Sequence, residues 1–304
     1  MYSLSTCWNS ARHTDGRVML REIRELGFEY AELSHGIRLS LVPGILDAVK
    51  AGEIKISTLH NFCPLPVGVT APAPNLYEFS SDRDRDRQLA YKHTMATLDF
   101  AVRVGAPLVV LHFGSMDLKD YSGKLKELLE RGKRGTPEFR KLTAEAQTAR
   151  EAKKGRFWDH SREVLRELVG EAKVRGLKFG IEIREAVEEL PIESDFESLL
   201  KEFPGPSVNY WHDTGHAQIK HDLGFIDHAQ FLGERADRLA GFHIHDVKFP
   251  ARDHFPPGGG DINFAALQPF VKPEHIKVFE LSPKVPVEVI RPSVKHLKQI
   301  WGEQ

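Results

Sequence analysis

The chain has 304 residues, of which 41% are hydrophobic and 28% are charged, a composition expected for a soluble globular protein with a large core. Lysine and arginine total 42 against 43 aspartate and glutamate, so the formal net charge of −1 argues against a protein that binds nucleic acid non-specifically. The two cysteines, the lack of a membrane-length apolar run and the lack of a signal-like start predict a cytoplasmic protein without disulfides or membrane contact.

Strand-like and helix-like segments alternate along the chain. Short apolar runs that end in turn-forming or polar residues predict eight strands, at residues 2–7, 28–33, 54–60, 107–113, 177–183, 208–213, 241–245 and 275–281. Eight helices are expected after them, at residues 18–26, 41–50, 82–104, 158–175, 195–202, 226–236, 264–270 and 287–301. Gly27, Gly52 and Gly105 provide stop signals after the first three helices.

This alternation predicts a parallel sheet with crossover helices, and eight units predict its closure into a (β/α)8 TIM barrel that spans residues 1–304 as one domain. The alternative is an open doubly wound sheet, which usually has a glycine-rich turn after its first strand, and this sequence has none. A proline-rich loop follows the third strand. The charged, helix-prone residues 115–155 are expected to form a helical insertion after the fourth strand.

Metal-competent side chains end six successive strands, where barrel enzymes place their catalytic groups. They are His60, His112, Glu182, Asp213 with His216 one turn further on, His243 with His245, and Glu280. Each group is costly to bury alone, and a cation would offset several such costs together. Glu182, Asp213, Glu280 and one strand-seven histidine form an oxygen-rich set that suits Mn²⁺, Mg²⁺, Co²⁺ or Zn²⁺; His243 and His245 share strand parity, so spacing alone does not choose between them.

Taken singly, these residues have plain structural explanations. A lone glutamate at a strand end is more often an ion-pair partner than a ligand, and His60 or His112 alone fits a satisfied core histidine equally well. His212 is out of phase with Asp213, which predicts a structural role. Surface or loop positions are expected for His35, His93, His221 and His228. The coincidence of such groups at successive strand ends favours a functional site.

Three stretches carry a resemblance to a known family. They are Asp213-Thr214-Gly215-His216, His243-Ile244-His245-Asp246-Val247-Lys248 and the segment 253–264 with its Pro256-Pro257-Gly258-Gly259-Gly260-Asp261 core. Over essentially its whole length the chain resembles the xylose isomerase-like superfamily, the sugar phosphate isomerase/epimerase group that also includes family 2 apurinic-site endonucleases. The resemblance implies a divalent cation held by Glu182, Asp213, His243 and Glu280.

The resemblance to ketose epimerases also implies a reaction. Glu182 and Glu280 would exchange protons with opposite faces of a substrate carbon through an enediolate. The implied substrate-binding residues are His60, His112, His216, His245, Glu32, Asp253 and His254. The glycine loop would cover the site, and it could hold a phosphate or be a plain turn. The epimerases also carry an arginine after the strand-seven histidine, for which Lys248 and Arg252 are only approximate candidates.

The expected function is a metal-dependent isomerase or epimerase of a small sugar, sugar phosphate or polyol-derived substrate, which could act as a homo-oligomer. One alternative is a dehydratase of an inosose- or shikimate-type ketone on the same metal site. Another is an apurinic-site endonuclease with several zinc ions, although Asp253 and His254 are adjacent here, whereas such enzymes have an arginine between the two. A non-enzymatic binding barrel would predict lost ligands, and all four are present.

Overall fold

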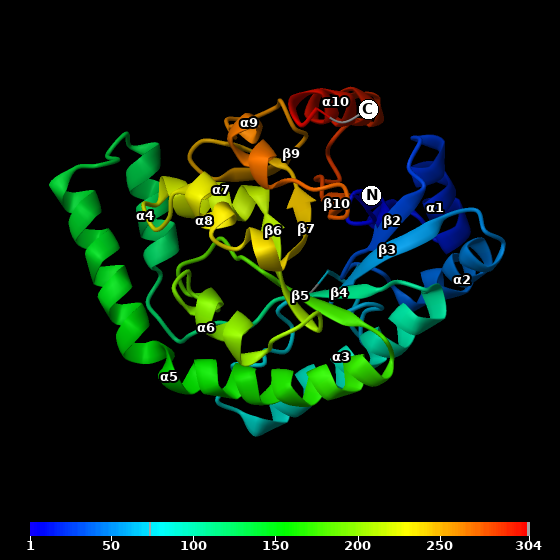
Figure 1. Ribbon diagram of the computed structural model, residues 1–304, viewed down its shortest axis with the longest axis horizontal. Helices are drawn as coiled ribbons and strands as arrows, with labels where there is room; N and C mark the ends of the chain where they lie inside the picture. The colour runs from blue at the N-terminus through cyan, green and yellow to red at the C-terminus, as the bar shows by residue number, and fades with distance from the viewer. Residues whose placement is uncertain (73, 303–304) are drawn as a thin grey trace.

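The computed structural model describes residues 1–72 and 74–302 and contains a closed barrel of eight parallel strands in the order β1-β10-β7-β6-β5-β4-β3-β2. The strands are β1 (Tyr2–Ser5), β2 (Tyr30–Leu33), β3 (Lys55–His60), β4 (Leu108–Leu111), β5 (Lys178–Glu182), β6 (Val208–Asp213), β7 (Leu239–Ile244) and β10 (Ile276–Phe279). Figure 1 shows them at the centre of the molecule with helices outside. The predicted (β/α)8 barrel is confirmed.

The helices cover the outside of the barrel through apolar faces. They are α1 (Gly16–Glu25), α2 (Val42–Lys50), α3 (Asp84–Val104), α4 (Tyr121–Glu130), α5 (Pro137–Val174), α6 (Asp195–Glu202), α7 (Thr214–Asp222), α8 (His228–Gly233), α9 (Phe264–Leu267) and α10 (Val287–Ile300). In α1, for example, Met19, Leu20 and Ile23 are buried, and the Asp15 carboxylate caps the first turn. No helix in residues 1–72 and 74–302 has both the length and the apolar character needed to cross a bilayer.

A separate layer of apolar side chains fills the inside of the barrel below the site. Trp211 on β6 packs there with Leu108, Val110, Ile276 and Val278. The tryptophan fits because its neighbours lack side chains: a Cβ at Gly241 would lie 2.6 Å from the indole, and one at Gly180 would lie 3.0 Å from it. The Trp211 ring lies 5.2 Å from that of His243, so this apolar layer supports His243 at the carboxyl end of the barrel.

Two predictions about helices were wrong. Residues 158–175 are not a separate helix, because α5 runs unbroken for 38 residues from Pro137 and its strong helix formers carry it past Gly155. The segment expected to be helical at 226–236 is helical only in the shorter α8 and a short 3-10 turn. Helix α7 was not predicted, since its sequence has no amphipathic period. The antiparallel ribbon of β8 (Asp246–Lys248) and β9 (Arg252–Phe255) was also missed.

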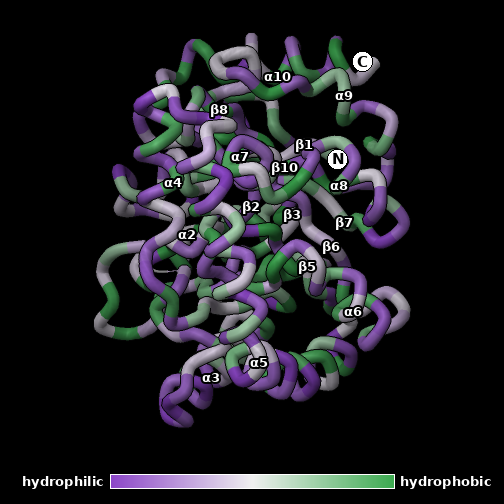
Figure 2. Tube along the Cα trace, turned by 90° about the vertical axis from the view of Figure 1, so that its left-hand side faces the viewer, coloured by the Kyte–Doolittle hydropathy of each residue, from purple (hydrophilic) through white to green (hydrophobic). Residues whose placement is uncertain are grey.

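The stretch 115–155 is largely helical, as expected, and forms α4 and the first half of α5. Helix α5 lies beside α3 in both views (Figures 1 and 2). Figure 2 shows hydrophilic and hydrophobic residues alternating along α5. The Glu188 carboxylate, from the loop after β5, accepts hydrogen bonds from the backbone of Tyr121 and Ser122 at the start of α4. The segment therefore contacts and supports the loop that follows β5. That residues 115–155 are an insertion relative to other barrels stays a prediction.

Candidate active site

The four ligands implied by the resemblance converge at the carboxyl end of the barrel. Each offers one ligand atom, and these atoms all lie within 4.8 Å of one another; the residues are Glu182, Asp213, His243 and Glu280. They come from β5, β6, β7 and the end of β10, which are neighbours in the barrel, and His243 is directly opposite Asp213 in the β6–β7 register. All four are buried. Parallel strands that end at one edge bring these distant residues together.

His243 is the centre of this group. Its Nδ1 lies 2.7 Å from Glu182 Oε1, 3.2 Å from Glu280 Oε2 and 3.8 Å from Asp213 Oδ2. Burial opposes protonation of the imidazole, yet the carboxylates of Glu280, Glu32 and Glu182 raise the pKa of His243 well above its usual value. Three buried carboxylates that face one imidazole are an excess of negative charge, and hard oxygen donors of this kind fit a divalent cation.

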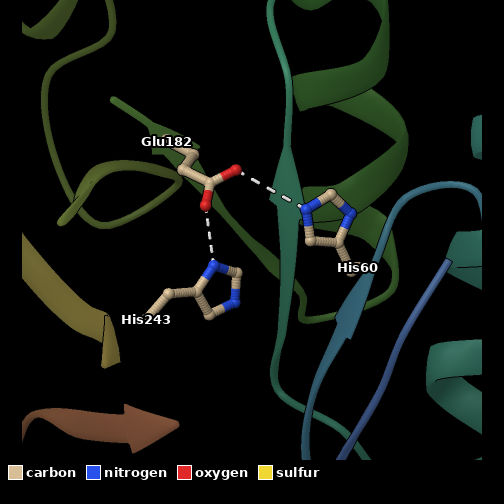
Figure 3. A group of neighbouring side chains, drawn as sticks. All are labelled: His60, Glu182 and His243. Carbon is tan, nitrogen blue, oxygen red and sulfur yellow. Dashed lines mark hydrogen bonds and ion pairs between the residues drawn. The ribbon is translucent and has the colours of Figure 1, made fainter. Parts of the chain in front are cut away.

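Glu182 lies between the histidines of the site. Figure 3 shows its carboxylate with one oxygen facing His243 and the other facing His60, whose Nε2 is 3.5 Å from Oε2. The same Oε2 also lies 2.8 Å from Nε2 of His112 and 3.2 Å from Nη1 of Arg184. Burial favours the neutral acid, but His243 and the other neighbouring donors lower the pKa of Glu182 well below its usual value, so the group is an anion.

Asp213 is held by the helix that follows it. It is the N-cap of α7, and its Oδ1 accepts a hydrogen bond of 2.7 Å from the backbone N–H of His216. Its carboxylate also lies 3.0 Å from Nε2 of His245. The Nδ1 of His216 is 3.4 Å from Asp213 Oδ2 and 3.3 Å from Nη1 of Arg184. These contacts orient Asp213 with its other oxygen toward the cluster.

The β8–β9 ribbon brings Asp253 and His254 to the same end of the barrel. The ring of His254 stacks on that of His245 at 4.2 Å, and its backbone N–H donates to Nδ1 of His245. His254 has a φ of 57°, a left-handed conformation that is uncommon for a residue other than glycine. Burial disfavours its charged form, but the adjacent Asp253 carboxylate, 3.2 Å away, raises the pKa of His254 to about 9. Both side chains are about one-third exposed, which places them at the rim.

Glu32 lies deeper than a distal substrate contact would require. It is fully buried, its Oε2 is 3.0 Å from Nε2 of His243, and it accepts a hydrogen bond of 2.8 Å from Thr58 Oγ1. The carboxylate therefore supports the back of His243. A ligand histidine with a second carboxylate on its other nitrogen is a common arrangement at metal sites.

Arg184 is the site residue that sequence reasoning missed. The two predicted candidates for an arginine after strand seven lie differently: Lys248 packs over the Phe255 ring, and Arg252 is exposed. Arg184 instead follows β5, two residues after Glu182, and contacts both Glu182 and His216. The sequence did contain a signal for Arg184: it lies two residues after Glu182, so the two side chains are expected to face the same side of the strand.

Of the histidines expected at the surface, His228 was placed wrongly and His35 is largely covered. His228, the first residue of α8, is buried, and its Nε2 lies 3.0 Å from Nε2 of His212 on β6. The ring of His35 packs against that of His60 at 4.8 Å. His212 itself is buried and contacts the Tyr210 hydroxyl, in agreement with its predicted structural role.

The glycine loop does not have the free donors that a phosphate would need. Asp246 accepts hydrogen bonds of 2.9–3.0 Å from the backbone N–H groups of Gly258, Gly260 and Ile262. The remaining glycine N–H of the loop, that of Gly259, donates to Pro256 O. The Asp246 carboxylate thus occupies the position that an anion would take.

Comparisons with known proteins identify the family of the chain. The model of the xylose isomerase-like TIM barrel family matches residues 20–300. The chain belongs to this family. None of the curated proteins compared with the sequence matches it.

Several solved structures are similar over nearly the whole chain. A D-tagatose 3-epimerase-like protein has 17% sequence identity and a TM-score of 0.70, with 99% of this chain and 98% of that chain covered. The 3-keto-D-glucoside 4-epimerase from E. coli has 16% identity and a TM-score of 0.66, with 98% of each chain covered. The IOLI protein, solved with a bound zinc atom, has 15% identity and a TM-score of 0.64, with 99% and 98% covered. At these identities the likeness establishes the fold.

Proposed function

We propose that this member of the family is a divalent-metal-dependent isomerase or epimerase of a small, unphosphorylated sugar or polyol-derived ketone. The convergence of Glu182, Asp213, His243 and Glu280 within 4.8 Å carries the proposal. The similar structures of a D-tagatose 3-epimerase-like protein, a 3-keto-D-glucoside 4-epimerase and a protein with a bound zinc atom support both the substrate class and the metal. The internal hydrogen bonds of the glycine loop favour a substrate without phosphate there.

The cation would be held by these four residues and, when bound, would polarise a substrate carbonyl and make the adjacent C–H more acidic. In the barrel order Glu182 on β5 and Glu280 after β10 lie at the two ends of the β10-β7-β6-β5 group, so their carboxylates would approach a bound substrate from two sides. In the proposed reaction one glutamate removes a proton from the substrate carbon and the other returns one, which inverts that centre. His112 and His216 donate to substrate oxygens as charge develops in the enediolate.

The experiment is a screen of ketoses, their phosphates and inosose-type ketones with Mn²⁺, Co²⁺, Mg²⁺ or Zn²⁺, with solvent deuterium incorporation as a second readout. Epimerisation gives a stereoisomer and dehydration gives loss of water, so product analysis separates the epimerase from the dehydratase. Glu182→Gln and Glu280→Gln should each lower kcat by roughly 10²–10⁴-fold with the fold intact. Glu127→Gln on α4 is the matched control, because that glutamate is exposed. Unchanged turnover in both site variants would sink the mechanism.

A second function is favoured by three further groups of candidate ligands around the same centre. They are His60 with Glu182 and His243, Asp213 with His216 and His245, and His245 with His254 and Glu280. Such overlapping groups suit an apurinic-site endonuclease with several zinc ions. The number of zinc ions per chain and cleavage of a duplex with an abasic site test this alternative. One tightly bound metal and no cleavage would exclude it.

A further inference from the structure

The protein contacts the guanidinium of Arg184 through two of its three nitrogens. Its Nε donates to Glu189 Oε1 at 3.0 Å, and its Nη1 lies 3.2 Å from Glu182 Oε2. The described part of the chain, residues 1–72 and 74–302, offers no hydrogen-bond partner to Nη2. The side chain is 14% exposed. Since an arginine presents five N–H donors in a fixed plane, Nε and Nη1 are engaged here and the donors of Nη2 remain available.

The residues around Arg184 fix its position. Glu189 also accepts from the backbone N–H of Ala186, and Asn75 Nδ2 lies 3.5 Å from Glu189 Oε1. The other end of the Asn75 amide contacts Nδ1 of His112 at 2.7 Å. The loops after β3 and β5 therefore hold Arg184 and His112 in one network beside Glu182. Burial opposes ionisation of Glu189, but Arg184 lowers the pKa of Glu189 to about 2, so this anchor keeps its charge.

We propose that Arg184 is a substrate-binding residue, whose Nη2 donates to an oxygen of the bound polyhydroxy ketone next to the carbon that faces Glu182. The proposal rests on the proposed function for the class of substrate. A hydroxyl or carbonyl oxygen of a neutral sugar is the partner that the local charge favours. The acidic groups Glu32, Glu182, Glu189, Asp213, Asp253 and Glu280 outnumber the cationic Arg184 and His254, and this excess of negative charge disfavours a dianion.

Substitution of Arg184 can separate substrate binding from metal binding, which substitution of a metal ligand cannot do. Glu182 is a candidate metal ligand, so its loss would remove both metal and substrate binding. Arg184 contacts the outer oxygen of Glu182 and lies on the side of the cluster that holds His216, so its loss should weaken substrate binding and leave the metal in place. A residue that only buttressed Glu182 would instead change metal affinity.

The test compares Arg184→Ala and Arg184→Lys with the wild-type protein loaded with Mn²⁺ or Co²⁺. The alanine variant should raise KM by about ten- to a hundredfold, and millimolar guanidinium should restore part of the loss. Lysine should restore only part, because it lacks the planar fork. Metal affinity by calorimetry should stay close to wild type. Arg162→Ala is the matched control, since Arg162 on α5 is also paired with carboxylates, those of Asp159 and Glu202.

Two results would overturn the proposal: an unchanged KM in Arg184→Ala, or a loss explained entirely by weaker metal binding and absent guanidinium rescue. A parallel arm measures binding of ketoses and alditols by calorimetry, without turnover. If the wild type binds such a compound but converts none, the proposed function fails, and the Arg184 proposal is decided by whether the alanine variant loses that binding. A wild-type protein that binds none of them overturns both.

Discussion

The carboxylate of Glu32 lies 3.0 Å from Nε2 of His243, while Nδ1 on the opposite side of the imidazole faces the carboxylates of the candidate metal centre. Glu32 is the last but one residue of β2, and β2 is far from β7 in the barrel order, so this contact crosses the inside of the barrel. It fixes both the plane of the ring and the nitrogen that remains free to bind a cation.

We therefore expect Glu32→Gln to weaken metal binding by roughly 10–100-fold, because the amide no longer supports the ligand histidine with a full negative charge. Isothermal titration with Co²⁺ or Mn²⁺ measures the effect. Glu29→Gln is the control, since Glu29 precedes the same strand and is exposed. Equal metal affinity in Glu32→Gln and wild type would contradict the positioning role.

Removal of the metal should destabilise the protein. Without a cation the charge of the carboxylates of Glu182, Asp213 and Glu280 is offset in part by neighbouring imidazoles and Arg184. Metal at about 100 times its Kd stabilises a protein by about 2.7 kcal/mol, which corresponds to a rise in melting temperature of roughly 4 °C at this chain length. Calorimetry with and without a chelator measures the shift. Asp213→Asn should abolish most of it, and an identical shift in that variant would argue against this ligand set.

Stability should fall as the solution is acidified below the ordinary pKa of histidine. Burial, followed by the effect of His221, lowers the pKa of His228 to about 3, so the folded protein holds this imidazole neutral while the unfolded chain takes up a proton. The stability that this group contributes is complete above about pH 6.5 and decreases as the pH falls towards 3. At pH 5 the loss from a single group of this kind is about 2 kcal/mol.

Denaturant unfolding between pH 7 and pH 5 tests this expectation. His228→Gln keeps a polar partner for Gln218 and His212 but cannot titrate, so its free energy of unfolding should depend less on pH than that of the wild type. His296→Gln is the control, because that histidine is exposed. A pH dependence that is the same in all three proteins would refute the assignment to His228.

Asp246 should be required for the order of the glycine loop. Its carboxylate accepts from four backbone N–H groups, those of Val247, Gly258, Gly260 and Ile262. Asp246→Ala leaves these donors unpaired and should lower the free energy of unfolding by about 2–4 kcal/mol, with faster proteolysis within residues 256–262. Asp237→Ala, at an exposed position, is the control. The emptied loop should also bind inorganic phosphate, which the wild type should not; phosphate binding by the wild-type loop would contradict this account.

The sequence by itself determined the barrel and the metal-competent quartet. Eight short apolar runs alternate with helix-forming segments, and the preference for each element is local, so periodicity and stop signals suffice to predict it. Closure then brings the strand ends together, which is why residues as distant as Glu182 and Glu280 could be expected at one place. The choice of His243 over His245 needed the resemblance to a family, because both share strand parity.

Only the tertiary structure decided what surrounds the quartet. Glu32 supports His243 across the barrel, Glu189 and Asn75 hold Arg184, and Asp246 occupies the glycine loop. None of these contacts leaves a periodic signal in the sequence, because each joins loops or strands whose relative position depends on how the whole barrel closes. Helix α7 was missed for a related reason: it is fixed by the Asp213 cap and by packing against the β8–β9 ribbon, and not by an amphipathic pattern of its own.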